Sequence, residues 1–436
     1  MNVSGSFLSG NRYSLNRLLH SLLALTLLLS FNLLAQSVSL HNAEQTAIQS
    51  DPAQQIYADQ QAALIAQGIA GATLADPMLK LGMANIPTDS FQLDKDPMTQ
   101  LTVGLAQQFS RGAKRELTQK GFNQQSQLAV FQGLERQLMV KKSVQQLWFN
   151  ILFVEKALLL VKENKQLFAG FYRDLQSQFA LGMADNDALI AAEIEINKFD
   201  DKLAGLTQQS LNYRSLLSEW IGQDAYAQLA SEIPKWPDTK AYIKSVTPEN
   251  SDHYGLLGKH PKVKMLAQKI AVADNGIELA EQDYKPRFKV EVGYGHRLSK
   301  TEMGEPRADL LSAFVSMDMP LFTGKRQDQK LIAAQHIKGQ KQAEQRLLLR
   351  RLNAQLHAEI VNYRQLKARQ TRYQAHLLKQ AKLHVKLLEQ SYQSNTRPFK
   401  AVIDAYIHEQ TLSLEYQKLY FDGLKSLSKI RYFQAL

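Results

Sequence analysis

Two long stretches of the chain, 98–233 and 321–397, contain no proline. Both are rich in Ala, Leu, Gln and Lys, which favour helices, whereas proline removes a backbone donor and clashes with the preceding helical turn. Apolar residues recur in them at steps of three, four and seven, as on the buried face of a helix. The predicted helices cover 114–180, 185–222, 325–394 and 399–436. A helix over 114–180 is about 100 Å long. No single core surrounds such rods, so they must pack side by side as a coiled-coil-like layer.

The sequence also repeats itself. Residues 284–295 and 315–326 echo residues 76–82 and 103–115. In each copy two segments alternate apolar and polar residues, as strands do, and a long helical stretch follows them. The predicted strands cover 78–87, 99–109, 288–294 and 311–319, and shorter helices are predicted over 41–75 and 260–283. A repeat of one β-hairpin and one long helical hairpin predicts a chain that is mainly α with a small β part.

The first 35 residues have the pattern of a secretory signal. Arg12 and Arg17 precede a short apolar run, no acidic residue is present, and small residues such as Ala35 follow the run. A membrane anchor needs about 20 uninterrupted apolar residues, and this run is interrupted by polar ones. The predicted organisation is therefore a signal peptide at 1–35, a first repeat at 36–233, a connector at 234–259 and a second repeat at 260–436.

Composition narrows the possible partners. The chain has no cysteine, which rules out disulfides, thiolate metal sites and lipid attachment through an N-terminal cysteine. The formal net charge of +11 falls by two, to +9, when Arg12 and Arg17 leave with the signal. A basic chain can bind nucleic acid, but export and the dispersal of Lys and Arg along helices argue against that partner.

Four strands do not close a membrane barrel. An open sheet in lipid leaves the backbone donors and acceptors of its edge strands unpaired, which is very unfavourable. Either the strands lie in water, or several chains contribute strands to one barrel. Three chains would supply twelve strands, an even number that suits an outer-membrane barrel.

At this point the chain resembles the TolC-like outer-membrane efflux proteins. The resemblance covers nearly all of the mature chain, and its most specific parts are DPMLKLGMANIP at 76–87 and QQFSRGAKR at 107–115, which are similar to the heavy-metal, CzcC-like branch. The stretch PLFTGKR at 320–326 is typical of the superfamily at large. The resemblance implies a homotrimer with a 12-stranded outer-membrane β-barrel on a periplasmic α-helical barrel. It also implies a periplasmic adaptor and an inner-membrane pump of the resistance-nodulation-division type as partners.

The turns between the long helices are the sites that the resemblance points to. FALG at 179–182 aligns with YQSN at 392–395, and Gly or Asn suits a turn because both tolerate positive φ. In the family these turns form periplasmic tips that dock the adaptor and close the pore. The implied adaptor-docking residues are Gly182, Met183, Asn395 and Thr396. The implied aperture residues are Asp185, Asp187, Tyr392, Arg397 and Asp404. Ala188 and Ala401 stand where relatives can have acids, and Asp185 or Asp187 can instead be an ordinary helix cap.

Sequence motifs for an enzyme or a cofactor are absent. No pair of histidines has the H-x-x-x-H spacing of a helical metal site, and Gly293 and Gly295 lie inside a predicted strand, where they do not cradle a phosphate. We therefore expect no catalytic residue, metal or cofactor. The favoured function is an outer-membrane exit duct for heavy-metal cations. A duct for drugs or for type I protein secretion is the alternative within the same fold, and a structural coiled-coil envelope protein is the alternative outside it.

Overall fold

The structure is a computed structural model that describes residues 37–182, 186–247, 252–394 and 396–436. The predicted signal peptide lies outside these residues. The described chain forms two compact units, each assembled from segments that are distant in sequence. Unit 1 takes residues up to 50, with 143–235 and 368–425; unit 2 takes 51–142, 236–367 and 426–436.

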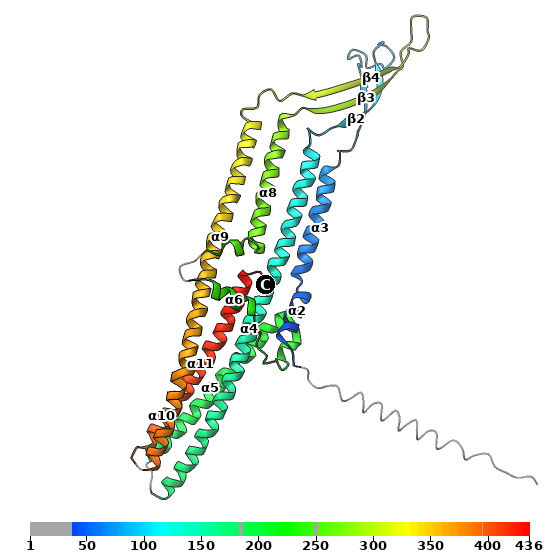
Figure 1. Ribbon diagram of the computed structural model, residues 1–436. Coiled ribbons are helices and arrows are strands. Elements are labelled where there is room, and N and C mark those ends of the chain that lie inside the picture. Colours follow the sequence, from blue (N-terminus) through cyan, green and yellow to red (C-terminus); the bar gives the residue numbers. More distant parts are fainter. Residues whose placement is uncertain (1–36, 183–185, 248–251, 395) are drawn as a thin grey trace, which may run out of the picture. The chain divides into compact units, whose positions relative to one another are not determined.

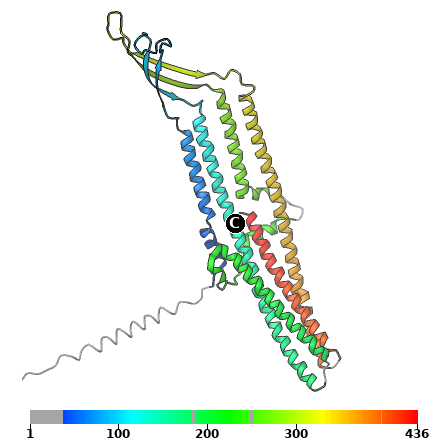
Figure 2. The ribbon, with the colours of Figure 1, turned by 180° about the vertical axis from the view of Figure 1, so that it is seen from behind.

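Unit 2 contains a four-stranded sheet and the helices that lead into it and out of it. In Figure 1, α3, α4, α8 and α9 all reach the sheet at the same end of this unit, and Figure 2 shows the same arrangement from behind. Its elements are α3 (Ala53–Ala72), β1 (Met78–Ala84), β2 (Gln100–Gln108), the start of α4 (Lys114–Ala180), α6 (Pro237–Ser245), α7 (Tyr254–Leu257), α8 (Pro261–Glu281), η3 (Gln282–Tyr284), β3 (Arg287–Arg297), β4 (Leu310–Asp318) and most of α9 (Gln327–Arg372).

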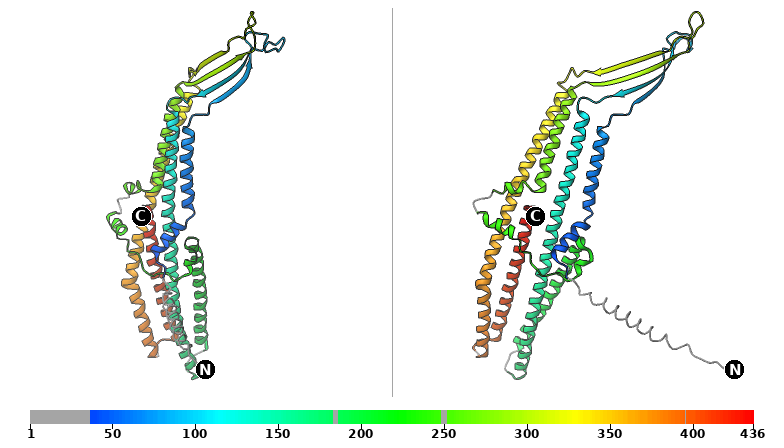
Figure 3. Two further views of the ribbon diagram at one scale, coloured as in Figure 1. Left: turned by 90° about the vertical axis from the view of Figure 1, so that its right-hand side faces the viewer. Right: turned by 45° about the vertical axis from the view of Figure 1, so that its right-hand side comes forward.

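Unit 1 is a bundle of long helices with a small irregular segment. Both of its helix-to-helix turns lie at the same end of the bundle, as Figure 3 shows from two sides. Its elements are α2 (Leu40–Ser50), the rest of α4, α5 (Asn186–Ile221), η2 (Gly222–Tyr226), a π turn η4 (Tyr373–Leu377), α10 (Leu378–Gln393) and most of α11 (Phe399–Phe433).

The predicted long helices are confirmed. α4 covers 67 residues without interruption. α9, the π turn and α10 together cover 327–393, which is the same length. α5 and α11 have 36 and 35 residues, so the second helix of each pair also matches its counterpart.

Among the described residues, one helix is long and apolar enough to cross a membrane, and it is α4. Half of its most apolar stretch is buried inside the protein, where Val144, Trp148 and Ile151 are inaccessible to solvent. We therefore assign this stretch to the core of unit 1.

Two predicted boundaries were wrong. The single helix expected over 41–75 is divided into α2 and α3, because Pro52 removes a donor and the Asp51 carboxylate accepts a hydrogen bond from Ala53 N at 3.1 Å. The strand expected over 78–87 ends at Ala84, because Asn85 takes a positive φ of 56°. The side-chain amide of Asn85 then donates to Met98 O at 3.1 Å and closes the loop between β1 and β2.

The sheet is antiparallel throughout, in the order β1-β2-β3-β4. Two hairpins, β1-β2 and β3-β4, join through the pairing of β2 with β3, so both sequence repeats contribute to one sheet. Leu81 pairs with Val103, Val103 with Tyr294, and Tyr294 with Leu311. This register places one row of apolar residues across all four strands.

Close helix packing and ion pairs fix the helices of unit 2 beneath the sheet. A Cβ added to Gly121 of α4 would come within 2.7 Å of the Asn275 amide of α8, which donates to Leu117 O. The carboxylate of Asp283 forms ion pairs with Lys114 of α4, whose Nζ is 3.0 Å away, and with Lys330 of α9, whose Nζ is 2.8 Å away. Burial raises the pKa of Asp283, but the hydrogen bonds from the two lysines outweigh that effect and leave it below its usual value.

The connector between the repeats is attached to α9 by histidines. His253 lies 100 residues or more from its partners in the second repeat: its backbone N donates to Asn353 Oδ1 at 2.8 Å, and its Nε2 lies 3.3 Å from His357 Nδ1. Tyr242 of α6 places its hydroxyl 2.9 Å from the other ring nitrogen of His253. The side chain of His253 is thereby buried with both of its ring nitrogens in contact with partners.

Candidate channel wall and helix tips

One face of the sheet is apolar and exposed. Successive side chains in a strand point to opposite faces, and the observed register keeps the apolar ones together across all four strands. In the described chain this face is open: Leu81 is 75% exposed and Leu311 is 78% exposed. The apolar face carries Leu79, Leu81, Met83, Leu101, Val103, Leu105, Phe288, Val290, Val292, Tyr294, Leu311, Ala313, Val315 and Met317, with Gln107 and His296 also on this face.

The opposite face holds every formally charged residue of the four strands, so the charges are completely separated from the apolar face. These residues are Lys80, Arg287, Lys289, Glu291, Arg297 and Asp318. The other residues on this face are Gly, Ala, Ser, Thr and Gln, together with Met78, Leu310 and Phe314, whose ring is exposed. Such a two-faced sheet has a lipid-compatible side and a water-compatible side.

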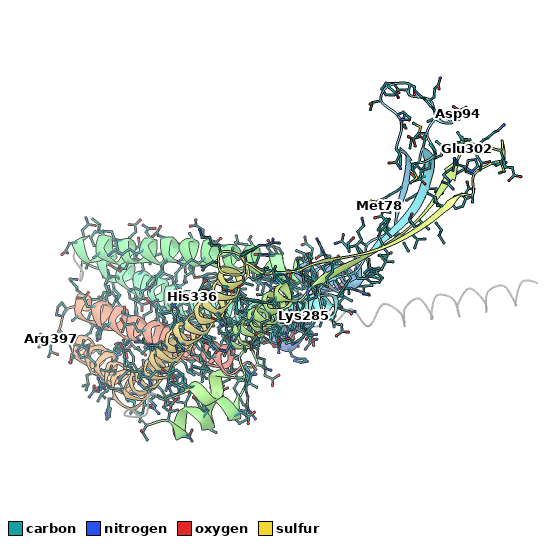
Figure 4. The ribbon with its side chains drawn as sticks, turned by 90° about the horizontal axis from the view of Figure 1, so that it is seen from above. Met78, Asp94, Lys285, Glu302, His336 and Arg397 are labelled. Carbon is teal, nitrogen blue, oxygen red and sulfur yellow. The ribbon has the colours of Figure 1, made fainter. Side chains whose placement is uncertain are left out.

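Neither face of the sheet is covered by another element of unit 2. Figure 4 shows the strands extending from the helices near Lys285 to the two loops that carry Asp94 and Glu302. In the described chain β1 and β4 are edge strands, each paired on one side only. A long apolar sheet with free edges pairs readily with further strands.

At the other candidate site, aromatic residues form the core between the helices of unit 1. Phe168 of α4 meets Phe171, Phe199 and Tyr406 with ring centroids 6.1, 5.0 and 6.3 Å apart, all edge-to-face. Phe399 at the start of α11 packs on Phe171 at 5.8 Å. This core, which we call the tip cluster, comprises Val161, Phe168, Leu175, Ala192, Phe199, Phe399 and Ile403.

The predicted aperture residue Tyr392 belongs to this packing. Its ring lies 5.2 Å from that of Phe399, and its hydroxyl donates to Gln178 Oε1 of α4 at 2.8 Å. The tyrosine of one turn is therefore bound to the helix that leads into the other turn. Near it, Tyr406 donates to Glu389, and burial followed by that hydrogen bond raises the pKa of Tyr406.

Two of the four predicted docking residues, Gly182 and Thr396, are described, and both lie in turns. Gly182 has a φ of +73°, the left-handed conformation expected of a glycine at a helix end. Thr396 Oγ1 donates to Ser391 O at 2.8 Å and closes the second turn. Met183, Asp185 and Asn395 lie outside the described residues.

The remaining predicted aperture residues are exposed. Asp187 lies in the first turn of α5, where the helix dipole favours an acid. Figure 4 shows Arg397 at the turn between α10 and α11. Asp404 faces Lys400 one turn away on α11, with Nζ 3.3 Å from both carboxylate oxygens. Within the chain, the contact of Asp404 is thus with Lys400, at the i,i+4 spacing.

Sequence reasoning missed several residues of these sites. The i,i+4 spacing of Lys400 and Asp404 is visible in the sequence. The bonds of Tyr392 to Gln178 and of Tyr406 to Glu389 join different helices, and spacing alone does not reveal them. In the described ranges no three His, Asp or Glu side chains come together in an arrangement that holds a metal ion.

No protein-family model and no curated protein matches this chain. Solved structures do match it over most of its length. CusC, studied for folding and transmembrane channel formation, has a TM-score of 0.73 at 13% identity, covering 91% of both chains. VceC, an outer membrane protein of Vibrio cholerae, has a TM-score of 0.72 at 14% identity, covering 91% of this chain and 96% of that one.

A third match is the open state of the MtrE outer membrane channel of Neisseria gonorrhoeae, with a TM-score of 0.67 at 12% identity, covering 91% of this chain and 88% of that one. Identities this low establish a shared fold and nothing finer. The resemblance to TolC-like proteins therefore holds at the level of fold. The chain has the fold of outer-membrane channel proteins, with duplicated long helical hairpins and two β-hairpins.

Proposed function

We propose that this protein is an outer-membrane exit duct of a tripartite efflux system and acts without chemistry of its own. The observation that carries the proposal is the separation of the sheet into an exposed apolar face and a face with all the strand charges. Lipid would cover the first face and water in the lumen would meet the second.

The free edges of the sheet support assembly into a homotrimer. An open sheet in lipid leaves edge donors and acceptors unpaired, so β4 of one copy must pair with β1 of the next. Three copies close a ring of twelve strands. The helices of each copy would then form a periplasmic barrel whose exposed apolar residues, such as Ile65, Leu159 and Leu347, meet neighbouring copies.

The helix tips would face the periplasm and dock an adaptor. Gly182, Met183, Asn395 and Thr396 are the proposed docking residues, because in the sequence they lie between α4 and α5 and between α10 and α11. An inner-membrane pump of the resistance-nodulation-division type would supply the energy. Asp185, Asp187, Tyr392, Arg397 and Asp404 are the proposed aperture residues, and Tyr392 would act by coupling the two turns through Gln178.

The proposed substrates are heavy-metal cations. This choice depends on the sequence stretches at 76–87, which contains β1, and at 107–115, which joins the end of β2 to the start of α4. A duct for drugs is the second outcome that the same experiment distinguishes.

Deletion of the gene, followed by growth on graded zinc, cobalt, cadmium, copper and silver with a drug panel alongside, tests the substrate. Selective metal sensitivity restored by the intact gene is the expected result. Sensitivity to drugs alone would replace the metal assignment and keep the duct. A protein that needs no detergent for extraction, or that forms no ion-conducting pore in a planar bilayer, would contradict the duct itself.

A further inference from the structure

The charges on the polar face of the sheet are unequal in number. Four are cations, Lys80, Arg287, Lys289 and Arg297, and two are acids, Glu291 and Asp318. The register places all six on the same face, so their fields add instead of being divided between two sides of the sheet.

Each acid lies between two cations. Glu291 forms an ion pair with Lys80 on one side and with Lys289 on the other, where Nζ lies 2.9 Å from the carboxylate. Asp318 forms an ion pair with Arg111, which precedes α4. It forms a second with Arg287, whose Nε lies 3.7 Å from the carboxylate. One positive charge is therefore left over at each acid.

Arg297 adds a further cation near the loop end of β3. Its guanidinium donates to the carbonyl oxygens of Ala308 at 2.7 Å and Pro97 at 3.4 Å, which orient it but carry no formal charge. The six strand residues thus leave an excess of two positive charges in each chain, and Arg111 adds one more beside them.

We infer that this face makes the open duct prefer anions, with Lys80, Lys289 and Arg287 as the residues that determine the preference. The inference rests on the proposed function, in which the charged face lines a lumen shared by three copies. The excess on the strands would then be about six positive charges around one pore, a ring of the kind that selects anions. Metal cations would still pass, because the pump drives them, but less readily than anions of similar size.

Salt concentration decides whether such a ring acts across a wide lumen. The Debye length is about 30 Å at 0.01 M salt and about 10 Å at 0.1 M. At the lower concentration the field of the wall extends into the lumen, and at the higher one it weakens towards the centre. The preference is therefore best measured at low salt, and it should decline as salt rises.

The experiment measures the reversal potential of single channels of the purified full-length protein in planar bilayers, under a tenfold KCl gradient from about 0.01 to 0.1 M. We expect the chloride-to-potassium permeability ratio to exceed one. The double variant Lys80→Glu, Lys289→Glu changes each chain by four charges, which inverts the excess, so the ratio should fall below one. A milder pair, Lys80→Gln and Lys289→Gln, tests the same residues with less risk to folding and should bring the ratio towards one.

Lys259→Glu is the matched control, because this exposed lysine lies between α7 and α8, away from the strands; its ratio should equal that of the unmodified protein. Pores that prefer potassium would overturn the inference and leave the duct proposal standing. A chloride preference that survives both double variants would overturn the assignment to these lysines. An unmodified protein that conducts no ions would instead contradict the proposed function.

Discussion

Phe168 in the tip cluster is 2% exposed, whereas Leu81 in the sheet is 75% exposed, although both are large apolar residues in regular structure. The helices of unit 1 bury their aromatic rings against one another inside a single chain. The strands of unit 2 align their apolar side chains on one face and leave that face open. The same hydrophobic effect acts on both, so the second region needs a covering that the chain does not supply.

The comparison separates two kinds of stability. Tip-cluster contacts stabilise the chain by itself, and substitutions there should change the free energy of unfolding. In the proposed duct the apolar face of the sheet would be stabilised by lipid, so substitutions there should change membrane insertion and leave the isolated helices intact.

The largest expected effect comes from Phe168→Ala. Removing a buried ring that touches three other rings leaves a cavity and should cost about 3–5 kcal/mol of unfolding free energy. Urea unfolding of the detergent-solubilised protein, followed by tryptophan fluorescence, measures it, because Trp148 and Trp220 both lie in unit 1. Leu181→Ala at the exposed turn is the control and should change little. Equal losses in the two variants would contradict the assignment of a core to this region.

The next largest effect is expected for Val292→Arg on the apolar face. An arginine at the bilayer midplane costs about 2–4 kcal/mol in each copy of an outer-membrane barrel. Assembly into phospholipid vesicles, followed by heat-modifiable migration on gels, should therefore drop sharply. Ser312→Arg introduces the same side chain on the neighbouring strand but on the charged face, and it should assemble normally. If both variants assembled equally well, the apolar face would not face lipid.

Local patterns predicted the elements well and the contacts between them poorly. The helix predicted over 114–180, before the interruption at Gly182, matches the limits of α4 at Lys114 and Ala180, and alternation located all four strands. The one long error, a single helix over 41–75, ignored Pro52, whose ring the interior of a helix does not accommodate. His253 and His357 are 104 residues apart, and no spacing rule brings such a pair together.

At the candidate sites, too, local patterns predicted residues better than the contacts between them. The alternation of β2 and β3 already implied two faces, yet the location of all six charges on one face depends on register, which only strand pairing fixes. At the tips, the resemblance indicated Tyr392 but not its bond to Gln178. The docking and aperture roles of all nine tip residues remain predictions, and Met183, Asp185 and Asn395 also lie outside the described residues.

A smaller effect, dependent on pH, is expected at the connector of unit 2. Burial lowers the pKa of His253 below its ordinary 6.5, His357 lowers it further, and Asp252 partly offsets both. The hydroxyl of Tyr242 is the other group that faces the ring. Because the unfolded chain takes up the proton first, the contribution of this contact is complete above about pH 6.5 and is lost as the pH falls below that value.

Hydrogen exchange of residues 252–260 at pH 7.5 and pH 5.0 measures this loss as a smaller protection factor, relative to the intrinsic exchange rate at each pH, at the lower pH. His253→Gln, which does not titrate in this range, should remove most of the difference between the two pH values. His408→Gln, at an exposed position of α11, should leave the difference unchanged. Protection factors that are the same at both pH values in the unmodified protein would contradict the prediction.

The smallest effect on stability is expected for Asp404→Ala. Its bond to Lys400 is an exposed pair at i,i+4, which contributes about 0.3–0.5 kcal/mol. Unfolding should therefore barely change. If Asp404 instead constricts the aperture against a neighbouring copy, its loss should raise the open probability of single channels well beyond what that small energy would produce.

Lys400→Ala separates the two roles, because it removes the same pair on α11 and leaves the carboxylate in place. A purely local pair predicts that both variants behave alike in unfolding and in conductance. An aperture contact predicts frequent opening for Asp404→Ala alone, since Asp404 freed from Lys400 would still reach a cation on the next copy. Equal open probabilities would remove Asp404 from the aperture and leave Asp185, Asp187, Tyr392 and Arg397 as the remaining candidates for closure.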